Sequence, residues 1–357
     1  MAVTIKDVAK MAGVSISTVS RVINNSKPVS SDIRDQVLRV IKETGYVPNP
    51  VARSLVTKKS NIIGVIVPDI SSLFVGDLLS GIEEIGRMYE YDIFLCNTYG
   101  ESERELKYIN LLKSKAVAGI IFVSEKLEKP QIDLVKESQI PSVYISKNAK
   151  DFDVYSIGID HKQASYDMTN YFINKGKQKI AFLRASVEDN IEDSERYKGY
   201  KKALEDSGID LDKSLVLQGD STNESGYRIV EVLIEKGNIP EAIFASSDEL
   251  AVGALNALLD NRINVPKDVS IAGYDDTRIA SMIRPSLTVI KQPIYDMGAV
   301  AARIIVKLID NQDVEEKYII LPHTLIERQS SYLFVFNTNV ICSIIVYIEP
   351  GVFVYQL

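Results

Sequence analysis

The hydrophobic positions of the chain repeat with two different spacings, and the change lies near residue 62. Before it, apolar residues recur three or four positions apart over residues 5–12, 16–23 and 31–44. Thr4, Ser15 and either Ser30 or Ser31 can cap these runs, and Gly45 follows the last. The pattern predicts three short helices.

From residue 62 onward, short apolar runs alternate with amphipathic segments. This alternation predicts parallel sheets covered by helices on both faces, and more than six such units favour two lobes over one sheet. We place the lobe boundary near Asp160. The expected strands are 62–67, 93–96, 119–123, 142–145, 180–183, 242–245 and 270–272, and the expected helices are 74–89, 101–115, 194–207, 223–236, 249–261 and 294–309.

The first sixty residues have the spacing of a helix-turn-helix unit. Ala9 is small enough for two helices to cross, Gly13 tolerates positive φ in the turn, and Val19 can lock the second helix. Three such residues alone would also suit an arbitrary small helical bundle. The residues left facing outward, which suit base edges and phosphates, are Ile16, Ser17, Thr18 and Arg21.

A hinge is predicted directly after this head. Pro50 suits the first position of a helix, and the segment 51–56 is too short to be stable alone. It should therefore order only when docked. Residues 57–61 have the composition of a linker.

Charge is distributed unevenly between the head and the rest. Residues 1–60 hold ten Lys or Arg and four Asp or Glu, a net of +6, whereas the remainder has a net of −13. A basic head on an acidic body is expected if only the head meets a phosphate backbone, although a chance excess of lysine would give the same sum.

Cysteine, histidine and the first residues exclude several classes of protein. Cys96 and Cys342 are distant, as are His161 and His323, so we expect neither a disulfide framework nor a metal site. The N-terminus lacks the apolar core of a signal peptide, so we expect a cytoplasmic protein. No nucleophile–base pair or phosphate-cradling glycine loop is visible, so we expect no enzyme and no cofactor.

Longer motifs resemble one family. Thr4-Ile5-Lys6-Asp7-Val8-Ala9, Gly13-Val14-Ser15 and Thr18-Val19-Ser20-Arg21-Val22 resemble the N-terminal signature of the lactose-repressor/galactose-repressor (LacI/GalR) family, and Gly45-Tyr46-Val47-Pro48-Asn49 with Ala52-Arg53-Ser54-Leu55 resembles its hinge. The resemblance covers about residues 2–330. It implies a homodimeric transcription regulator that binds double-stranded operator DNA. The implied DNA-binding residues are Thr4, Ile5, Ile16, Ser17, Thr18, Ser20, Arg21, Asn24, Asn49, Ala52 and Leu55.

In this family the paired hinge helices enter the minor groove, and a leucine, here Leu55, wedges open the central base step. The cost of unstacking, a few kcal/mol, is offset by added contacts. Simple packing of Leu55 against its own domain is the alternative.

The resemblance also implies the fold and the domains. It predicts an all-α helix-turn-helix head and an α/β body of two periplasmic-binding-protein-like lobes with parallel sheets. The expected domains are the head 1–48, the hinge and linker 49–61, an N-terminal lobe 62–160 joined by 292–320, a C-terminal lobe 161–291 joined by 321–330, and an atypical apolar tail 331–357.

Such a body binds small ligands in the cleft between its lobes. Asp248 and Asp275 follow predicted strands, where α/β sheets place ligand groups, but Asp248 is nearly as well suited to capping a helix. The candidate cleft residues are Leu73, Phe74, Arg196, Asp248 and Asp275. Two functions would use such a cleft. One is a sugar-responsive repressor that binds sugars or sugar phosphates there, and the other is a solute-binding protein; both are alternatives to a regulator controlled by a protein partner.

Further motifs resemble the members of the family that act in carbon catabolite control. They are Met88-Tyr89-Glu90-Tyr91-Asp92-Ile93, Gly199-Tyr200-Lys201-Lys202-Ala203-Leu204, Arg284-Pro285-Ser286-Leu287-Thr288 and the run from Gln292 to Ala301. The implied partner is the phosphocarrier protein HPr phosphorylated on a serine, which strengthens operator binding. The implied contacts are Tyr89, Tyr295, Asp296, Arg303 and Lys307.

The residues support that contact only in part. Arg303 and Lys307, one turn apart, can present two cations to a phosphoserine. A solvated helix face with a weak ion pair to Asp296 is the alternative. Ile304 stands where these relatives commonly have a second basic or larger residue, so the phosphate clamp would rest on Arg303 and Lys307 alone.

The end of the chain departs from the family. Residues 333–348 form an apolar, β-branched and aromatic run, interrupted by Asn337-Thr338-Asn339. A membrane span needs about twenty apolar residues, so this run predicts no span. An extra strand, or a frame-shifted or read-through tail, would explain it.

Overall fold

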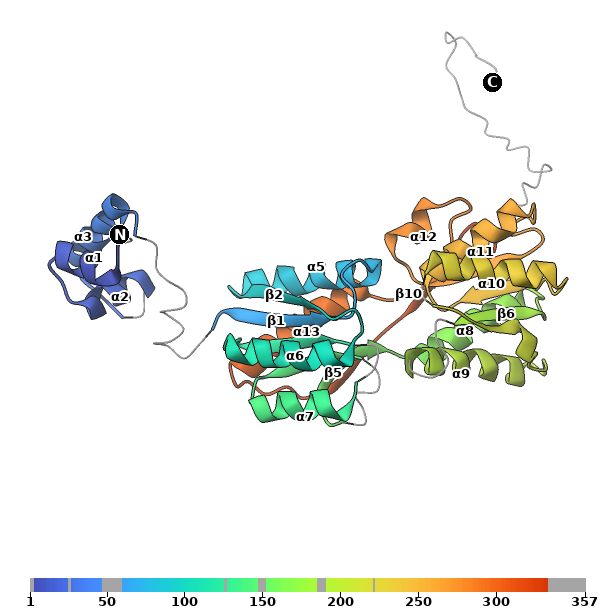
Figure 1. The fold of residues 1–357 in the computed structure, drawn as a ribbon, viewed down its shortest axis with the longest axis horizontal. Helices are drawn as coiled ribbons and strands as arrows, with labels where there is room; N and C mark the ends of the chain where they lie inside the picture. The colour runs from blue at the N-terminus through green and yellow to red at the C-terminus, as the bar shows by residue number, and fades with distance from the viewer. Residues whose placement is uncertain are drawn as a thin grey trace, which may run out of the picture.

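The computed structural model describes residues 3–24, 27–46, 60–124, 127–146, 152–184, 191–220 and 222–332. The predicted fold class is confirmed: a helical head and a two-lobed α/β body (Figure 1). One departure is that β12 runs antiparallel to β10, so the second sheet is not wholly parallel.

The head consists of α1 (Ile5–Met11), α2 (Ile16–Asn24) and α3 (Ser31–Thr44). Gly13 has φ +57°, as the turn requires. Thr4 and Asp7 form a reciprocal cap at the start of α1. The head has a small apolar core of its own, made by Val8, Ala9, Ala12, Val19, Val22, Val37 and Val40.

The N-terminal lobe is built on a six-stranded parallel sheet in the order β11-β5-β4-β3-β1-β2. Its strands are β1 (Ile62–Val67), β2 (Asp92–Asn97), β3 (Gly119–Val123), β4 (Ser142–Ile145), β5 (Tyr155–Ile159) and β11 (Tyr318–Leu321), and its helices are α5 (Leu73–Met88), α6 (Ser102–Ser114), α7 (Lys129–Ser138) and α13 (Ile294–Ile309). Helices α5 and α13 pack together over one face of the sheet, whereas α6 and α7 cover the other.

The C-terminal lobe repeats this plan in the order β12-β10-β9-β8-β6-β7. Its strands are β6 (Ile180–Arg184), β7 (Val216–Gln218), β8 (Ala242–Ala245), β9 (Ser270–Asp275), β10 (Thr288–Lys291) and β12 (Thr324–Ile326). Its helices are α8 (His161–Asn174), α9 (Ile191–Asp206), α10 (Asn223–Glu235), α11 (Asp248–Asp260) and α12 (Arg278–Met282), with a 3₁₀ turn at Lys213–Leu215.

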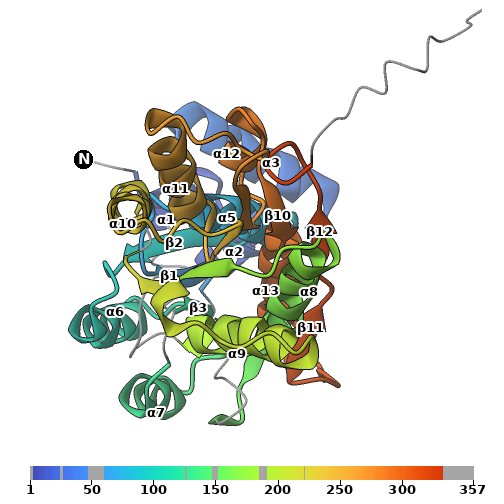
Figure 2. The ribbon, with the colours of Figure 1, turned by 90° about the vertical axis from the view of Figure 1, so that its right-hand side faces the viewer.

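Three segments cross between the lobes (Figure 1), and Figure 2 views the molecule with the C-terminal lobe toward the reader. The first joins β5 to α8 at Asp160, the second joins β10 to α13 at Gln292 and Pro293, and the third joins β11 to β12 at Pro322 and His323. Because α13 comes after the second crossing, this helix late in the chain belongs to the N-terminal lobe.

The predicted strands and helices of the head and the two lobes are all present, some with the predicted bounds and the others with ends shifted by one to three residues. The strand that contains Asp275 is longer than predicted, because it continues through Gly273 and Tyr274 to Asp275. The apolar spacing missed β5, β7, β10, β11, β12 and the helices α7, α8 and α12. Several of these are short or mix polar with apolar residues, so their periodicity is weak.

Candidate nucleic-acid interface, cleft and partner surface

Helix α2 presents a mixed polar face to solvent. Ile16 is 45 % exposed, and Ser17 and Arg21 are also exposed, whereas Val19 and Val22 are buried in the core of the head. Thr18 and Ser20 are half-buried beside them. The face that the sequence assigned to base edges is therefore turned outward, with its apolar anchors on the opposite side.

Ser15 organises the start of that helix. Its hydroxyl accepts a hydrogen bond from the backbone N–H of Thr18 at 3.1 Å and lies 2.7 Å from the Ser17 hydroxyl and 2.8 Å from that of Thr18. The two hydroxyls that the sequence predicts to contact DNA are thus held in place by Ser15. Preorganised side chains lose less conformational freedom on binding.

Thr4 and Ile5 lie at the start of α1. The backbone N–H and the hydroxyl of Thr4 donate to Asp7 at 2.9 and 2.7 Å, and these bonds lower the pKa of the Asp7 carboxyl. Asn24 is the last residue of α2, and its side chain lies outside the described part of the structure. Asn49, Ala52 and Leu55 also lie outside the described residues.

The structure brings two of the predicted cleft residues, Arg196 and Asp275, together at the carboxyl end of β9, which we call the cleft edge of the C-terminal lobe. An Arg196 Nη atom lies 3.9 Å from Asp275 Oδ1, and the guanidinium lies over the Tyr274 ring, 4.0 Å from its centroid. Nη1 donates to the Ser246 carbonyl oxygen at 2.6 Å. Asp275 in turn accepts from the Gln292 amide at 2.6 Å. Both charges are therefore buried and held by several partners.

His161 contributes to this group although the sequence gave little reason to expect it. Its Nδ1 lies 2.5 Å from the Tyr274 hydroxyl and accepts from Arg196 Nε at 3.4 Å. It stands at the start of α8, directly after a strand that the apolar pattern missed. Its rarity was the one available signal, because the chain has only two histidines.

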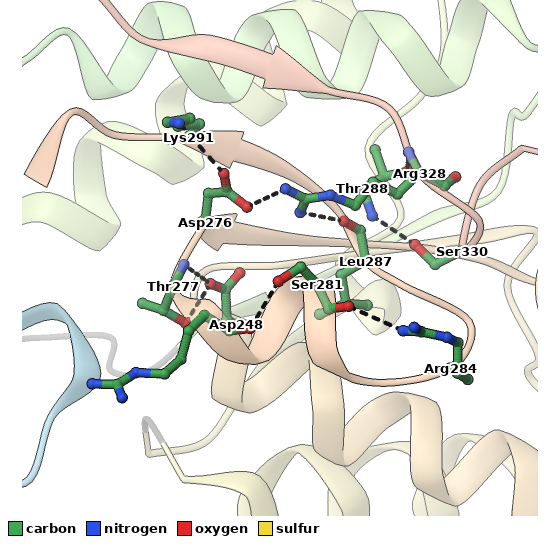
Figure 3. A network of polar contacts seen from close by, with 11 residues as sticks. Asp248, Asp276, Thr277, Ser281, Arg284, Leu287, Thr288, Lys291, Arg328 and Ser330 are labelled. Carbon is green, nitrogen blue, oxygen red and sulfur yellow. Dashed lines mark hydrogen bonds and ion pairs between the residues drawn. The ribbon is translucent and has the colours of Figure 1, made fainter. Parts of the chain in front are cut away.

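Asp248 lies beneath the cleft residues, with no exposed surface. Ser247 caps α11, so Asp248 does not have the capping role that its position suggested. Its carboxylate accepts instead from the backbone N–H and hydroxyl of Thr277 at 2.7 and 2.9 Å, at the start of α12 (Figure 3). Burial, and then the charge of Asp275, raise the pKa of Asp248 well above its usual value. A ligand contact for Asp248 stays a prediction, and it would require this carboxylate to become accessible.

Leu73 and Phe74 belong to the opposite lobe. They form the first turn of α5, just after β1 ends, and both are half-buried. Phe74 packs against the core between the sheet and helices α5 and α13. They stand at the carboxyl edge of their sheet, where α/β proteins place ligand contacts.

The residues of the predicted partner contact gather on α5 and α13. Tyr295, Asp296, Arg303 and Lys307 are exposed on α13, and Tyr89 is 50 % exposed at the end of α5. No ion pair within 4.0 Å joins Asp296 to Arg303 or Lys307, all of which the structure describes. The ion pair expected under the alternative reading is therefore not formed.

Two residues of this surface were missed by the sequence analysis. The Tyr295 hydroxyl donates to Glu84 on α5 at 2.6 Å, and this bond raises the pKa of Tyr295. Met88, which is 68 % exposed, lies next to Tyr89. We call the face formed by Glu84, Met88, Tyr89, Tyr295, Asp296, Arg303 and Lys307 the partner surface.

Two glycines bring α5 and α13 into backbone contact. A Cβ atom at Gly298 would lie 2.1 Å from the Leu78 carbonyl oxygen, and one at Gly81 would lie 2.1 Å from that of Tyr295. Neither position can hold a side chain without moving a helix. The two helices that form the partner surface are therefore locked to one another.

Within the described ranges, no cluster of three His, Cys, Asp or Glu side chains could hold a metal ion. A search of the same residues finds no helix that is both long and apolar enough to cross a membrane.

Comparison with known proteins agrees with this arrangement. Residues 4–49 match the family described as bacterial regulatory proteins, lacI family, and residues 169–331 match a periplasmic binding protein-like domain. Catabolite control protein A of Priestia megaterium is 41 % identical over 331 residues, which cover 93 % of this chain and all of that protein.

Two solved structures extend the comparison. The transcription regulator CcpA of Lactococcus lactis is 34 % identical, with a TM-score of 0.70 over 76 % of this chain and 99 % of that one. The lac repressor dimer bound to operator and the anti-inducer ONPF is 26 % identical, with a TM-score of 0.85 over 93 % of this chain and all of that one.

Proposed function

Because the chain belongs to the LacI family of DNA-binding transcription regulators and is similar to catabolite control proteins, we propose that serine-phosphorylated HPr strengthens its binding to operator DNA. In this proposal the chain acts as a homodimer. Two heads contact two half-sites of a pseudo-palindrome, while the paired hinges bend its centre.

The observation that carries the proposal is the pair of exposed cations on α13. Arg303 and Lys307 stand one turn apart on an exposed face, and no carboxylate lies within 4.0 Å of either among the described residues. A phosphoserine offers three acceptor oxygens and about two negative charges to such a pair. Met88, Tyr89 and Tyr295 lie on or at the end of the two packed helices α5 and α13 and add exposed apolar area, which suits a protein partner better than a free anion.

The test compares operator binding with and without the partner. Operator sequences are first selected from a random DNA pool, and affinity is then measured by fluorescence anisotropy at fixed salt. We expect saturating phospho-HPr to raise operator affinity about tenfold or more in the natural chain, and not in Arg303→Ala or Lys307→Ala. Lys201→Ala on α9, whose amine lies 3.7 Å from Glu205 on another exposed helix face, is the matched control. Equal affinity with and without phospho-HPr would contradict the mechanism.

The DNA-binding part has a separate test. Arg21→Ala should weaken operator binding, and Leu55→Ala should remove most of the bend while leaving the half-site contacts. Gel-shift and bending assays measure the two effects. If both variants bind and bend the operator as the natural chain does, the assignment of these residues is wrong.

A small ligand in the cleft is the second candidate regulator, and the Arg196–Asp275 group supports it. A cation and a carboxylate side by side at the carboxyl edge of the sheet suit the hydroxyls or phosphate of a sugar. Calorimetry with a panel of sugars and sugar phosphates separates this candidate from HPr control. Binding that Arg196→Met abolishes would support it, and a panel without any binder would argue against it.

A further inference from the structure

A buried amide stands between the cleft residues and the partner surface. Gln292 lies in the second crossover, directly after β10, and is 4 % exposed. Its side-chain Nε2 donates to Asp275 Oδ1 at 2.6 Å, and its backbone N–H donates to the Asp275 carbonyl oxygen at 3.2 Å. Two hydrogen bonds thus fasten this crossover to the end of β9.

The other side of Gln292 leads at once to the partner surface. The backbone N–H of Ile294 donates to the Gln292 carbonyl oxygen at 2.9 Å, and α13 starts at Ile294. Tyr295 and Asp296 both lie in its first turn. Only two residues separate the amide that contacts Asp275 from the tyrosine on the partner surface.

A displacement of the first turn of α13 should also displace α5. Gly81 and Gly298 hold the backbones of α5 and α13 against one another, and the Tyr295 carbonyl is itself one of the contacts. Close-packed interiors transmit displacement, since they have no free volume to absorb it. Glu84, Met88 and Tyr89 on α5 would therefore shift together with Tyr295.

The end of β9 is a segment that its neighbours must hold in place. Asp275 has φ +106° and Asp276 has φ +62°, values that residues other than glycine rarely adopt. Such conformations persist only where the surroundings fix them, and they gather at ligand sites and switches. Arg328 fixes Asp276 with a 2.6 Å ion pair (Figure 3), and Gln292 fixes Asp275 from the crossover.

We propose that Gln292 is a positioning residue that couples the contacts of Asp275 in the cleft to the geometry of the partner surface. A ligand hydroxyl that takes Asp275 Oδ1 competes with the Gln292 amide for that oxygen. The start of α13 then changes its attachment to the C-terminal lobe. The identity of the partner rests on the proposed function, but the mechanical link from Gln292 to α13 does not.

The test uses the full chain and three variants. Gln292→Leu removes the donor at similar size, and Gln292→Glu places a second carboxylate against Asp275. Arg328→Met is the matched control, because it removes the ion pair to Asp276 and a 2.9 Å bond to the Leu287 carbonyl without touching the crossover. Hydrogen exchange of the amides of residues 294–298 and the Kd of phospho-HPr for the operator-bound protein are measured for each.

We expect both Gln292 variants to exchange faster over residues 294–298 and to raise the Kd of phospho-HPr about fivefold or more, with Gln292→Glu the stronger. Operator affinity without HPr should stay within about twofold of that of the natural chain. The core of the head is made of the head's own residues, far from this crossover along the chain. In the double variant Gln292→Glu with Asp275→Asn, the amide at position 275 donates to the carboxylate at position 292. Hydrogen exchange over residues 294–298 should then return toward that of the natural chain.

Unchanged exchange in both Gln292 variants would overturn the proposal, as would an equal increase in Arg328→Met. If the natural chain does not bind phospho-HPr, the proposed function fails. The exchange comparison then still decides whether Gln292 positions α13, so the two failures are distinguishable.

Discussion

The cleft edge and the partner surface each contain an arginine, but the surroundings of the two arginines are opposite. Arg196 is buried over Tyr274 and bonded to Ser246, His161 and Asp275. Arg303 is exposed on α13. The charge of Arg196 is balanced inside the protein, whereas the charge of Arg303 is exposed and could pair with a partner at little cost of desolvation.

This difference predicts different consequences of removing each charge. A buried charge that loses its partner stays desolvated and destabilises the fold, whereas an exposed one is simply hydrated. Stability and regulation should therefore separate: changes at the cleft edge affect both, and changes on the partner surface affect regulation alone.

The largest effect on stability is expected from Arg196→Met. It leaves the Asp275 carboxylate without its cation and frees the Ser246 carbonyl, so unfolding should become easier by about 3 kcal/mol. Arg303→Met should leave the denaturation midpoint unchanged. Urea unfolding of the two variants measures this, and similar losses of stability in both would show that Arg196 and Arg303 do not differ in this way.

A second buried ionisable group, Glu105 in the N-terminal lobe, should make stability depend on pH. Glu105 on α6 is buried and accepts from Gln131 at 3.0 Å and Ser124 at 3.3 Å. Burial raises its pKa to about 7. The folded state binds the Glu105 proton more tightly than the unfolded chain does. Protonation of Glu105 therefore stabilises the fold, and this stabilisation is fully present below the usual glutamate pKa and is lost as pH rises to about 7.

Glu105→Gln should remove that dependence. Each pKa unit corresponds to about 1.4 kcal/mol, so a rise from 4.5 to about 7 means that the variant should gain about 3 kcal/mol relative to the natural chain between pH 4 and pH 8. Thermal unfolding across this range checks it. Parallel stability curves for the two proteins would show that the Glu105 carboxyl titrates normally.

The contact between α5 and α13 beneath the partner surface should have the next largest effect on stability. Gly298→Ala puts a Cβ atom against the Leu78 carbonyl oxygen, so α13 must move away from α5 at a cost of about 1–3 kcal/mol. Its regulatory effect should exceed that of its neighbour Ala299→Gly, which removes a methyl group instead. A variant with natural stability and natural response to phospho-HPr would show that the contact is not tight.

Tyr295→Phe should have the smallest effect on stability. It removes only the exposed hydrogen bond to Glu84, so no resolvable change in Tm is expected. Any change should appear in the affinity for phospho-HPr. A clear loss of Tm would mean that the partner surface also carries part of the fold.

Local patterns in the sequence predicted the parts of the molecule that depend on local spacing. Gly13, Val19 and the exposed face of α2 follow from helical periodicity, and α13 begins and ends where predicted. Arg303 and Lys307 could be placed on one face because residues seven and eleven positions after Asp296 return to similar angles.

The cleft edge could be predicted only in part. Asp275 ends a strand and could be inferred, but His161, Tyr274 and Gln292 come together from α8, β9 and a crossover. That meeting depends on sheet order and on three crossings between lobes, which spacing along the chain does not encode. Asp248 shows that the same signal can mislead. It also follows a strand, but its carboxylate accepts a hydrogen bond from Thr277 in the interior of the lobe.

Control of operator binding by phospho-HPr can be tested in one titration. Operator binding is followed by fluorescence anisotropy, with and without saturating serine-phosphorylated HPr, for the full natural chain and for Arg303→Ala. We expect a gain in operator affinity of about tenfold or more for the natural chain and little or none for the variant. Equal operator affinity under all four conditions, or an equal gain in both proteins, would contradict it.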